Sequence, residues 1–167
     1  MKRKKKLYQR PMKLYQKGRI MEENVLVKKY GLKNKREIWK TLAKVNYFRK
    51  RAMALSRASS EEQEVFFNKL QNVGLKVKSM ADVLGLKVED LLNRRLPTII
   101  VSKGLATTPK QARQMVVHKK ILVDGGVVNI PSYIVPTNLE SKITVKKVNL
   151  KKVVAKVEDN VKEGENN

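Results

Sequence analysis

The spacing of apolar residues changes near residue 120, and this change predicts two kinds of secondary structure. Before it, apolar positions recur every three to four residues, the period of a helix with one buried face. After it come short β-rich runs separated by Gly, Asp and Pro. Helices are predicted over 19–32, 34–57, 59–72, 79–85, 88–95, 97–103 and 109–120, and strands over 121–123, 127–130 and 143–145. We therefore expect the α+β class: an N-terminal helical part, then two short helices and a small, mostly antiparallel sheet.

The longest predicted helix, 34–57, is amphipathic and basic. Its apolar stripe on a helical wheel contains Ile38, Trp39, Leu42, Val45, Ala52 and Met53, and its opposite side carries Arg36, Lys40, Lys44, Tyr47 and Arg51. Asn34 followed by Glu37 has the spacing of a capping box. Arg49 falls toward the apolar stripe, so its stem must lie along the edge of the core. A basic face can be an ordinary solvated surface, but such surfaces mix both signs, and here only Glu37 interrupts the cations.

The helix predicted over 109–120 has clear start signals. Thr108 is a good N-cap, Pro109 suits the first helical position, and Gln111 stands three residues after the cap. One side of the wheel holds Ala112, Met115 and Val116, and the other holds Lys110, Arg113, Gln114 and His118. Because Arg113 lies on the polar side, Arg113→Ala is expected to leave the fold almost unchanged and to weaken phosphate binding by about 1 to 2 kcal/mol.

Residues 121–145 have the pattern of a hairpin followed by an edge segment. Asp124, Gly125 and Gly126 separate the two β-rich runs and suit the positive φ angles of a tight turn. Pro131 and Pro136 bracket the segment SYIV, which is too short and Pro-flanked for a central strand. The last residues, 149–167, are predicted to be a flexible tail; an amphipathic helix docked on a neighbour is the less favoured alternative.

The charge pattern points to a polyanionic partner. The formal net charge is +23, from 38 basic and 15 acidic residues. Residues 1–60 hold 20 basic and 3 acidic side chains, residues 61–93 hold 4 and 6, residues 94–147 hold 10 and 2, and residues 148–167 hold 4 and 4. Because a nearly neutral block separates two basic ones, we expect two basic surfaces of the protein to bind one folded nucleic acid. An anionic membrane is the rival partner, but no run of 18 apolar residues or secretory signal is present, so we expect no membrane association and a cytoplasmic protein.

Few residues could carry catalysis or bind a metal. The chain has no cysteine and one histidine, so cysteine chemistry and a histidine metal cluster are excluded, and no metal or cofactor is expected. His118 has no nearby carboxylate to orient it as a general base, and Asp124 is common at turns for conformational reasons. Neither phosphate-loop glycine pattern occurs. We therefore expect a non-enzymatic protein.

Three segments resemble the small-subunit ribosomal protein four family, in its archaeal and eukaryotic branch. The segment KGLATTPKQARQMVVHKKILVDGGVVNIPSY is similar to the family's RNA-binding domain, and the upstream similarity lies in NKREIWKTLAKVNYFRKRA and LLNRRL. The resemblance implies an αL-type domain: two antiparallel helices and a sharply bent sheet. It also implies direct binding to small-subunit rRNA, contacts with neighbouring small-subunit proteins, and a place near the site where mRNA enters. Many bacterial members carry a cysteine zinc knuckle, which this chain lacks.

These observations together give an expected organisation and a set of RNA-binding residues. We expect a basic arm (1–18), a helical rRNA-binding part (19–93), the αL-type domain (94–148) and the tail (149–167). The basic arm could instead be only a solubilising tail, but tyrosines among its cations suit unstacked bases. The expected RNA-binding residues are Arg36, Lys40, Lys44, Tyr47, Arg51, Arg94, Arg95, Lys103, Lys110, Gln111, Arg113, Gln114, His118, Lys119 and Lys120.

Two other functions fit parts of the sequence. The αL-type domain also occurs in RNA-modifying and tRNA-charging enzymes, so the chain could be an RNA-binding accessory of such an enzyme, with catalysis in another chain. The two short helices could form a helix-turn-helix DNA binder. The first alternative is less favoured because the N-terminal half resembles the ribosomal branch. The second is less favoured because the polar helix face has few base-reading side chains and leads directly into a hairpin.

Overall fold

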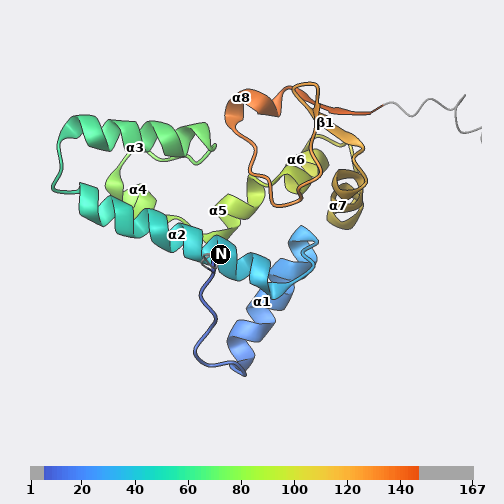
Figure 1. Ribbon diagram of the computed structural model, residues 1–167. Coiled ribbons are helices and arrows are strands. Elements are labelled where there is room, and N and C mark those ends of the chain that lie inside the picture. The colour runs from blue at the N-terminus through green and yellow to red at the C-terminus, as the bar shows by residue number, and fades with distance from the viewer. Residues whose placement is uncertain (1–5, 147–167) are drawn as a thin grey trace, which may run out of the picture.

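A computed structural model describes residues 6–146, and its elements follow the predicted order with one unpredicted addition, a short helix between the last two strands (Figure 1). The first part comprises α1 (Lys17–Tyr30), α2 (Lys35–Leu55), α3 (Ser60–Asn72), α4 (Met80–Gly85) and α5 (Val88–Asn93). The second part comprises α6 (Leu96–Ser102), α7 (Pro109–Val117), β1 (Ile121–Val123), β2 (Gly126–Val127), α8 (Thr137–Glu140) and β3 (Ile143–Val145). The α+β prediction is confirmed. The start of the expected basic arm, residues 1–5, and the expected tail lie outside the described residues.

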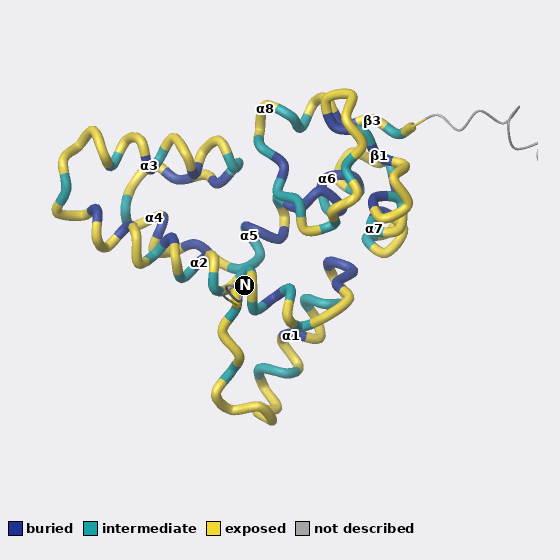
Figure 2. Tube along the Cα trace, in the orientation of Figure 1, coloured by how far each residue is buried: buried dark blue, intermediate teal, exposed yellow. Residues whose placement is uncertain are grey.

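The long helix α2 organises the first part. In Figure 1, α3 runs back alongside α2 with α4 between them. Their shared core contains Val45, Phe48, Ala52 and Leu55 of α2, Phe66 and Leu70 of α3, and Leu75, Val77, Val83, Leu86 and Leu91 from the chain that follows. The α2 members are spaced three or four residues apart, so they share one face of the helix. Figure 2 shows buried residues on the facing sides of α2, α3 and α4.

The predicted apolar stripe of α2 is partly wrong. Leu42 and Met53 are 42% and 60% exposed, whereas Phe48 and Leu55, which we did not assign to the stripe, are buried. The buried line is displaced around the helix because α3, α4 and α5 approach it along positions 45, 48, 52 and 55. Arg49 lies at the edge of this core, as expected, and its guanidinium donates a hydrogen bond of 2.7 Å to the carbonyl of Leu86.

The end of α1 connects the first part to the second. Gly31 ends α1 in the left-handed conformation, with φ of 59°. A Cβ on Gly31 would lie 2.9 Å from the carbonyl carbon of Pro109, at the first turn of α7. Glycine is therefore required here both by the backbone conformation and by the close approach of α7. Tyr30 and Leu32, on either side, are buried with Ile38 of α2 and Leu92 of α5.

The second part is a small domain with its own core. α6 and α7 pack on each other, and the antiparallel sheet has the strand order β2-β1-β3. The core contains Leu96, Ile99 and Ile100 of α6, Ala112 and Val116 of α7, Ile121, Val123 and Ile143 of the sheet, and Ala106 and Val135. Asp124 and Gly125 form the hairpin turn with φ of 53° and 78°, as predicted. The second strand is shorter than predicted: it comprises Gly126 and Val127, and the last backbone bond to β1 comes from the Val128 amide.

The segment between Pro131 and Pro136 pairs with residues 94–96, which form the joint between the two parts. The Leu96 amide donates to the carbonyl of Tyr133 at 2.9 Å, and the Val135 amide donates to the carbonyl of Arg94 at 3.0 Å. Ile134 and Arg95 form an isolated antiparallel bridge. The segment is thus an edge, as predicted, but its partner is the joint and not the sheet. The expected boundary between residues 93 and 94 stays a prediction.

Candidate nucleic-acid interface

The basic face of α2 is exposed in the folded protein. Arg36, Lys40, Lys44, Tyr47 and Arg51 follow one another at intervals of three or four residues, and all five are exposed. The buried line through Val45 and Ala52 lies on another side of the helix. The prediction that these five residues share a solvent-facing surface is therefore confirmed, while their contact with RNA stays a prediction.

A groove of about 800 Å³ runs between this face and the second part of the chain. It is lined from α2 by Arg36, Glu37, Lys40, Lys44 and Tyr47, and from the second part by Arg95, Arg113, Pro131, Ser132 and Ile134, among others. Arg51 lies beyond the groove, further along the same face of α2. The structure thus brings six of the predicted residues together from three segments distant in sequence.

The floor of the groove contains one carboxylate held by two arginines. Arg113 of α7 donates two hydrogen bonds to Glu37, at 3.1 and 2.8 Å, and Arg95 donates a further one. Burial by itself would raise the pKa of Glu37, but the hydrogen bonds from Arg113 and Arg95 outweigh it and lower the pKa. The Arg95 side chain is only 7% exposed, and Glu37, which is 18% exposed, is its counter-ion.

This ion triad corrects two predictions. Arg113 does not project freely toward solvent: its side chain is 22% exposed and bound to Glu37, so Arg113→Ala is no longer expected to leave the fold unchanged. Asn34 makes no side-chain cap on α2, and Glu37 does not complete a capping box with it. The physical reason is the same in both cases. The Glu37 carboxylate accepts charged hydrogen bonds from Arg95 and Arg113 and a longer one, at 3.3 Å, from the Lys33 amide, so it is directed toward the two cations.

Arg94 is also engaged at the joint. Its guanidinium donates to the carbonyls of Val73 and Val135, both at 3.0 Å, and to the carboxylate of Glu140 at 2.9 Å. Gly74 passes so close that a Cβ there would lie 2.4 Å from the Arg94 Nε atom. Both arginine side chains therefore tie the two parts together, and their predicted contact with RNA stays a prediction.

The remaining cations of the groove have no such partner. Among residues 6–146, Arg36, Lys40 and Lys44 form no ion pair with a carboxylate. The Lys44 ammonium lies 5.8 Å from the centre of the Phe48 ring, and partial desolvation lowers the pKa of Lys44. These three side chains are free to neutralise phosphates.

A second basic surface lies on α7 and the turn after it. Six exposed residues form it, and none of them lines the groove: Lys110, Gln111, Gln114, His118, Lys119 and Lys120. Thr108 caps α7 as predicted: its hydroxyl accepts a 3.2 Å hydrogen bond from the Gln111 amide. The Gln111 side-chain oxygen accepts from the amide and the hydroxyl of Thr107, and not from the Thr108 amide. Lys103 donates to the carbonyl of Glu140. Their predicted RNA contacts stay predictions.

The role of Glu37 and the loop residues that close the groove were not predicted from the sequence. A signal for Glu37 was present: it is the single acid on the basic helix, and a partly buried carboxylate requires cations or hydrogen-bond donors nearby. Pro131, Ser132 and Ile134 carried no such signal. Within residues 6–146 no cluster of His, Asp or Glu could hold a metal, and no helix is long and apolar enough to cross a bilayer.

Comparison with known proteins identifies a domain family and several relatives of the whole chain. Residues 94–141 match the family model described as the S4 domain. The small ribosomal subunit protein uS4 of Nanoarchaeum equitans is 44% identical over 84% of this chain and 83% of its own length. Proteins of the same name are 43% identical in Methanothermobacter thermautotrophicus (83% and 85% covered) and 45% identical in Methanococcus aeolicus (75% and 75%). These alignments extend well beyond the matched domain, and the chain belongs to the uS4 family of small ribosomal subunit proteins.

Proposed function

We propose that this protein is a non-enzymatic structural constituent of the small ribosomal subunit, and that it binds rRNA through the groove beside α2. The observation that carries the proposal is the asymmetry of that groove. Its acid, Glu37, is neutralised by Arg95 and Arg113, while Arg36, Lys40 and Lys44 remain unpaired among the described residues. A net charge of +23 destabilises the folded chain by repulsion among its cations, and a polyanion bound in the groove reduces this repulsion.

Recognition in the groove is of backbone and shape. Lysine and arginine side chains on a helix contact phosphates, which position a nucleic acid but carry no sequence information. The major groove of an A-form helix is too deep and narrow for side chains to read the bases. Arg36, Lys40 and Lys44 therefore select a folded RNA whose phosphates match their spacing along α2.

The exposed surface of α7 supplies a second contact. This surface belongs to the second basic block of the chain, residues 94–147. Its solvent-facing residues are Lys110, Gln114, His118, Lys119 and Lys120. Two surfaces joined by the ion triad bind one folded RNA more tightly than either alone, since the second contact is intramolecular. We include in the proposal neighbouring small-subunit proteins as partners, contact with mRNA near the place where it enters, and a cytoplasmic location within the ribosome.

Sedimentation and direct binding test the proposal. A tagged chain is expressed in cells, and the extract is separated on gradients at low and high salt; we expect it with the small subunits. Purified protein is then titrated with transcribed small-subunit rRNA and, as a control, with transcribed large-subunit rRNA. The proposal fails if the chain stays at the top of the low-salt gradient, or copurifies stoichiometrically with an RNA-modifying enzyme and without ribosomes.

A further inference from the structure

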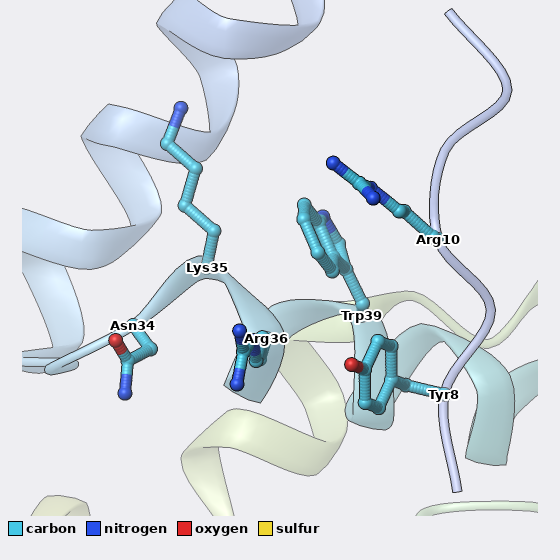
Figure 3. Close-up of a pocket in the computed structure, with 6 residues that line it drawn as sticks. All are labelled: Tyr8, Arg10, Asn34, Lys35, Arg36 and Trp39. Carbon is cyan, nitrogen blue, oxygen red and sulfur yellow. The ribbon is translucent and has the colours of Figure 1, made fainter. Parts of the chain in front are cut away.

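A smaller cavity of about 310 Å³ adjoins the groove and is lined by two aromatic side chains (Figure 3). We call it the aromatic cavity; its lining residues are Tyr8, Arg10, Asn34, Lys35, Arg36 and Trp39. Asn34 and Arg36 line the groove as well, so the two spaces share a wall. The volume falls at the small end of the roughly 300 to 1,000 Å³ typical of small-ligand sites.

The Trp39 ring is fixed in orientation. Its indole N–H donates a 3.0 Å hydrogen bond to Glu23, which also accepts from Arg19 at 2.6 Å. The Lys35 ammonium lies 3.4 Å from the other carboxylate oxygen. Burial acts to raise the pKa of Glu23, but bonds from Trp39 and the cations outweigh it and lower the pKa, so the carboxylate stays ionised. The cavity is thus preorganised on its α2 side.

The N-terminal segment delivers the second ring. The centres of the Tyr8 and Trp39 rings are 6.1 Å apart and their planes are inclined by 35°. Arg19 holds the same segment by donating to the carbonyls of Lys13 and Leu14, at 3.0 and 2.9 Å. Tyr15 is 91% exposed, whereas Tyr8 is half-buried. The segment therefore places one of its two tyrosines at the cavity.

The charged side chains that line the aromatic cavity are all basic, and Glu23 lies behind Trp39 and Lys35. None of its six lining residues is acidic, and Arg10, Lys35 and Arg36 contribute three cations. Figure 3 shows the Trp39 ring between the Arg10 side chain and the Tyr8 ring. Within residues 6–146, neither Arg10 nor Arg36 takes part in an ion pair with a carboxylate. Aromatic faces beside guanidinium groups match a flat base carried on an anionic backbone.

We infer that the aromatic cavity binds a single unpaired nucleotide of the RNA that occupies the groove. The base stacks against Trp39 and Tyr8, and Arg10 and Arg36 contact its phosphates. The nucleotide must be unpaired, because bases in a duplex are stacked on one another and only loops, bulges and ends expose their faces. The inference rests on the proposed function, since the groove is what brings RNA to the cavity.

Trp39 is the single tryptophan of the chain and reports on its own site. The full chain is titrated with a uridine decanucleotide and, separately, with a blunt RNA duplex, and tryptophan fluorescence is read along with the anisotropy of a label on the RNA. We expect the single strand to quench Trp39 and the duplex to bind without comparable quenching. A single strand that binds without quenching, or does not bind at all, overturns the inference.

Matched variants test the geometry. Tyr8→Ala removes one ring of the cavity, while Tyr15→Ala removes the exposed tyrosine of the same segment. We expect Tyr8→Ala to weaken decanucleotide binding by about 10-fold, within the range for loss of one stacking side chain, and Tyr15→Ala by less than about twofold. Arg10→Gln should also weaken binding and lower its salt dependence. Equal affinities of the two tyrosine variants overturn the inference.

Two further measurements separate this inference from the proposed function. Binding of wild-type protein to small-subunit rRNA tests the proposed function alone. If it is retained while the decanucleotide leaves Trp39 unquenched, only the aromatic cavity is misassigned; if it is absent, the proposed function fails as well. Titration with a polyglutamate peptide tests a protein ligand, and quenching as strong as with RNA overturns the nucleotide assignment.

Discussion

The exposed face of α2 and the joint between the two parts are both basic, yet they use their cations differently. On α2, Arg36, Lys40 and Lys44 form no ion pair among the described residues and line an open groove. At the joint, the Arg94 and Arg95 side chains are 16% and 7% exposed and are bound to Glu140 and Glu37. The first set is available to an external anion, and the second set already has its anions.

The two sets of cations have different roles: those on α2 are available for RNA binding, and those at the joint stabilise the packing of the two parts. An ion pair with a nearly buried arginine cannot lose one partner without leaving the other charge uncompensated, which is costly away from bulk water. A solvated cation can be removed with little effect on folding. Substitutions at the joint should therefore change thermal stability, and substitutions on the α2 face should change RNA affinity. Four predictions, from the largest effect to the smallest, test this division.

Glu37→Ala should have the largest effect. It leaves the nearly buried Arg95 and its neighbour Arg113 without their shared carboxylate. We expect a loss of about 3 kcal/mol, toward the low end for breaking a buried pair, and a decrease in Tm of roughly 6 to 12 °C. Glu22→Ala is the matched control, because Glu22 is exposed on α1. Equal melting temperatures for the two variants would show that the triad does not stabilise the joint.

Arg113→Ala should destabilise the fold less than Glu37→Ala. It removes two charged hydrogen bonds but leaves Glu37 paired with Arg95, so a loss of about 2 kcal/mol is expected. Lys110→Ala, on the exposed side of the same helix, should change stability by less than about 0.5 kcal/mol. Thermal melts of Arg113→Ala and Lys110→Ala compare the two sides of the helix. Melts of Arg113→Ala, Glu37→Ala and the double variant measure the coupling energy between Arg113 and Glu37. Additive losses in the double variant would contradict a shared site.

Lys40→Ala and Lys44→Ala should act on RNA binding and not on folding. Each removes one phosphate contact, so affinity for small-subunit rRNA should decrease by about 1 kcal/mol, or roughly fivefold. The slope of log affinity against log salt should become shallower by about 0.7 to 0.9 per lysine. Filter binding at several salt concentrations measures both quantities. Lys50→Ala is the control, because Lys50 is exposed on α2 but outside the groove; if it has the same effect, the groove is not the specific site.

The smallest expected effect is a pH dependence of the triad. The folded-state pKa of Glu37 is lowered from its ordinary value of 4.5. Its ion pairs therefore stabilise the fold fully above about pH 4.5, and this contribution is lost as the pH falls through the lowered pKa. Glu37→Gln cannot titrate, so the difference in Tm between wild type and this variant should shrink as the pH is lowered from 6 toward 3. A difference that stays constant over this range would exclude an ionised Glu37 as its source.

Local structure was predictable from the sequence wherever one or two residues set the backbone conformation. Thr108 and Pro109 start α7, and Asp124 with Gly125 forms the hairpin turn, both as expected. These signals act within a few residues of the chain, because caps and positive φ angles satisfy nearby backbone groups. The exposed basic face of α2 was predictable for a similar reason, since helical periodicity alone places Arg36, Lys40 and Lys44 on one side.

Tertiary structure decided which side chains meet. Arg113 is 76 residues from Glu37 in sequence, and no local pattern could indicate that the polar face of α7 turns toward the start of α2. The same is true of Phe48, which is buried where α4 and α5 pack, and of Leu42, which they leave exposed. Periodicity fixes the angle between residues on one helix but not the direction from which its neighbours approach. The sequence by itself thus determined the helices, the turns and the cations, and the packing of the two parts determined which of those cations remain open to RNA.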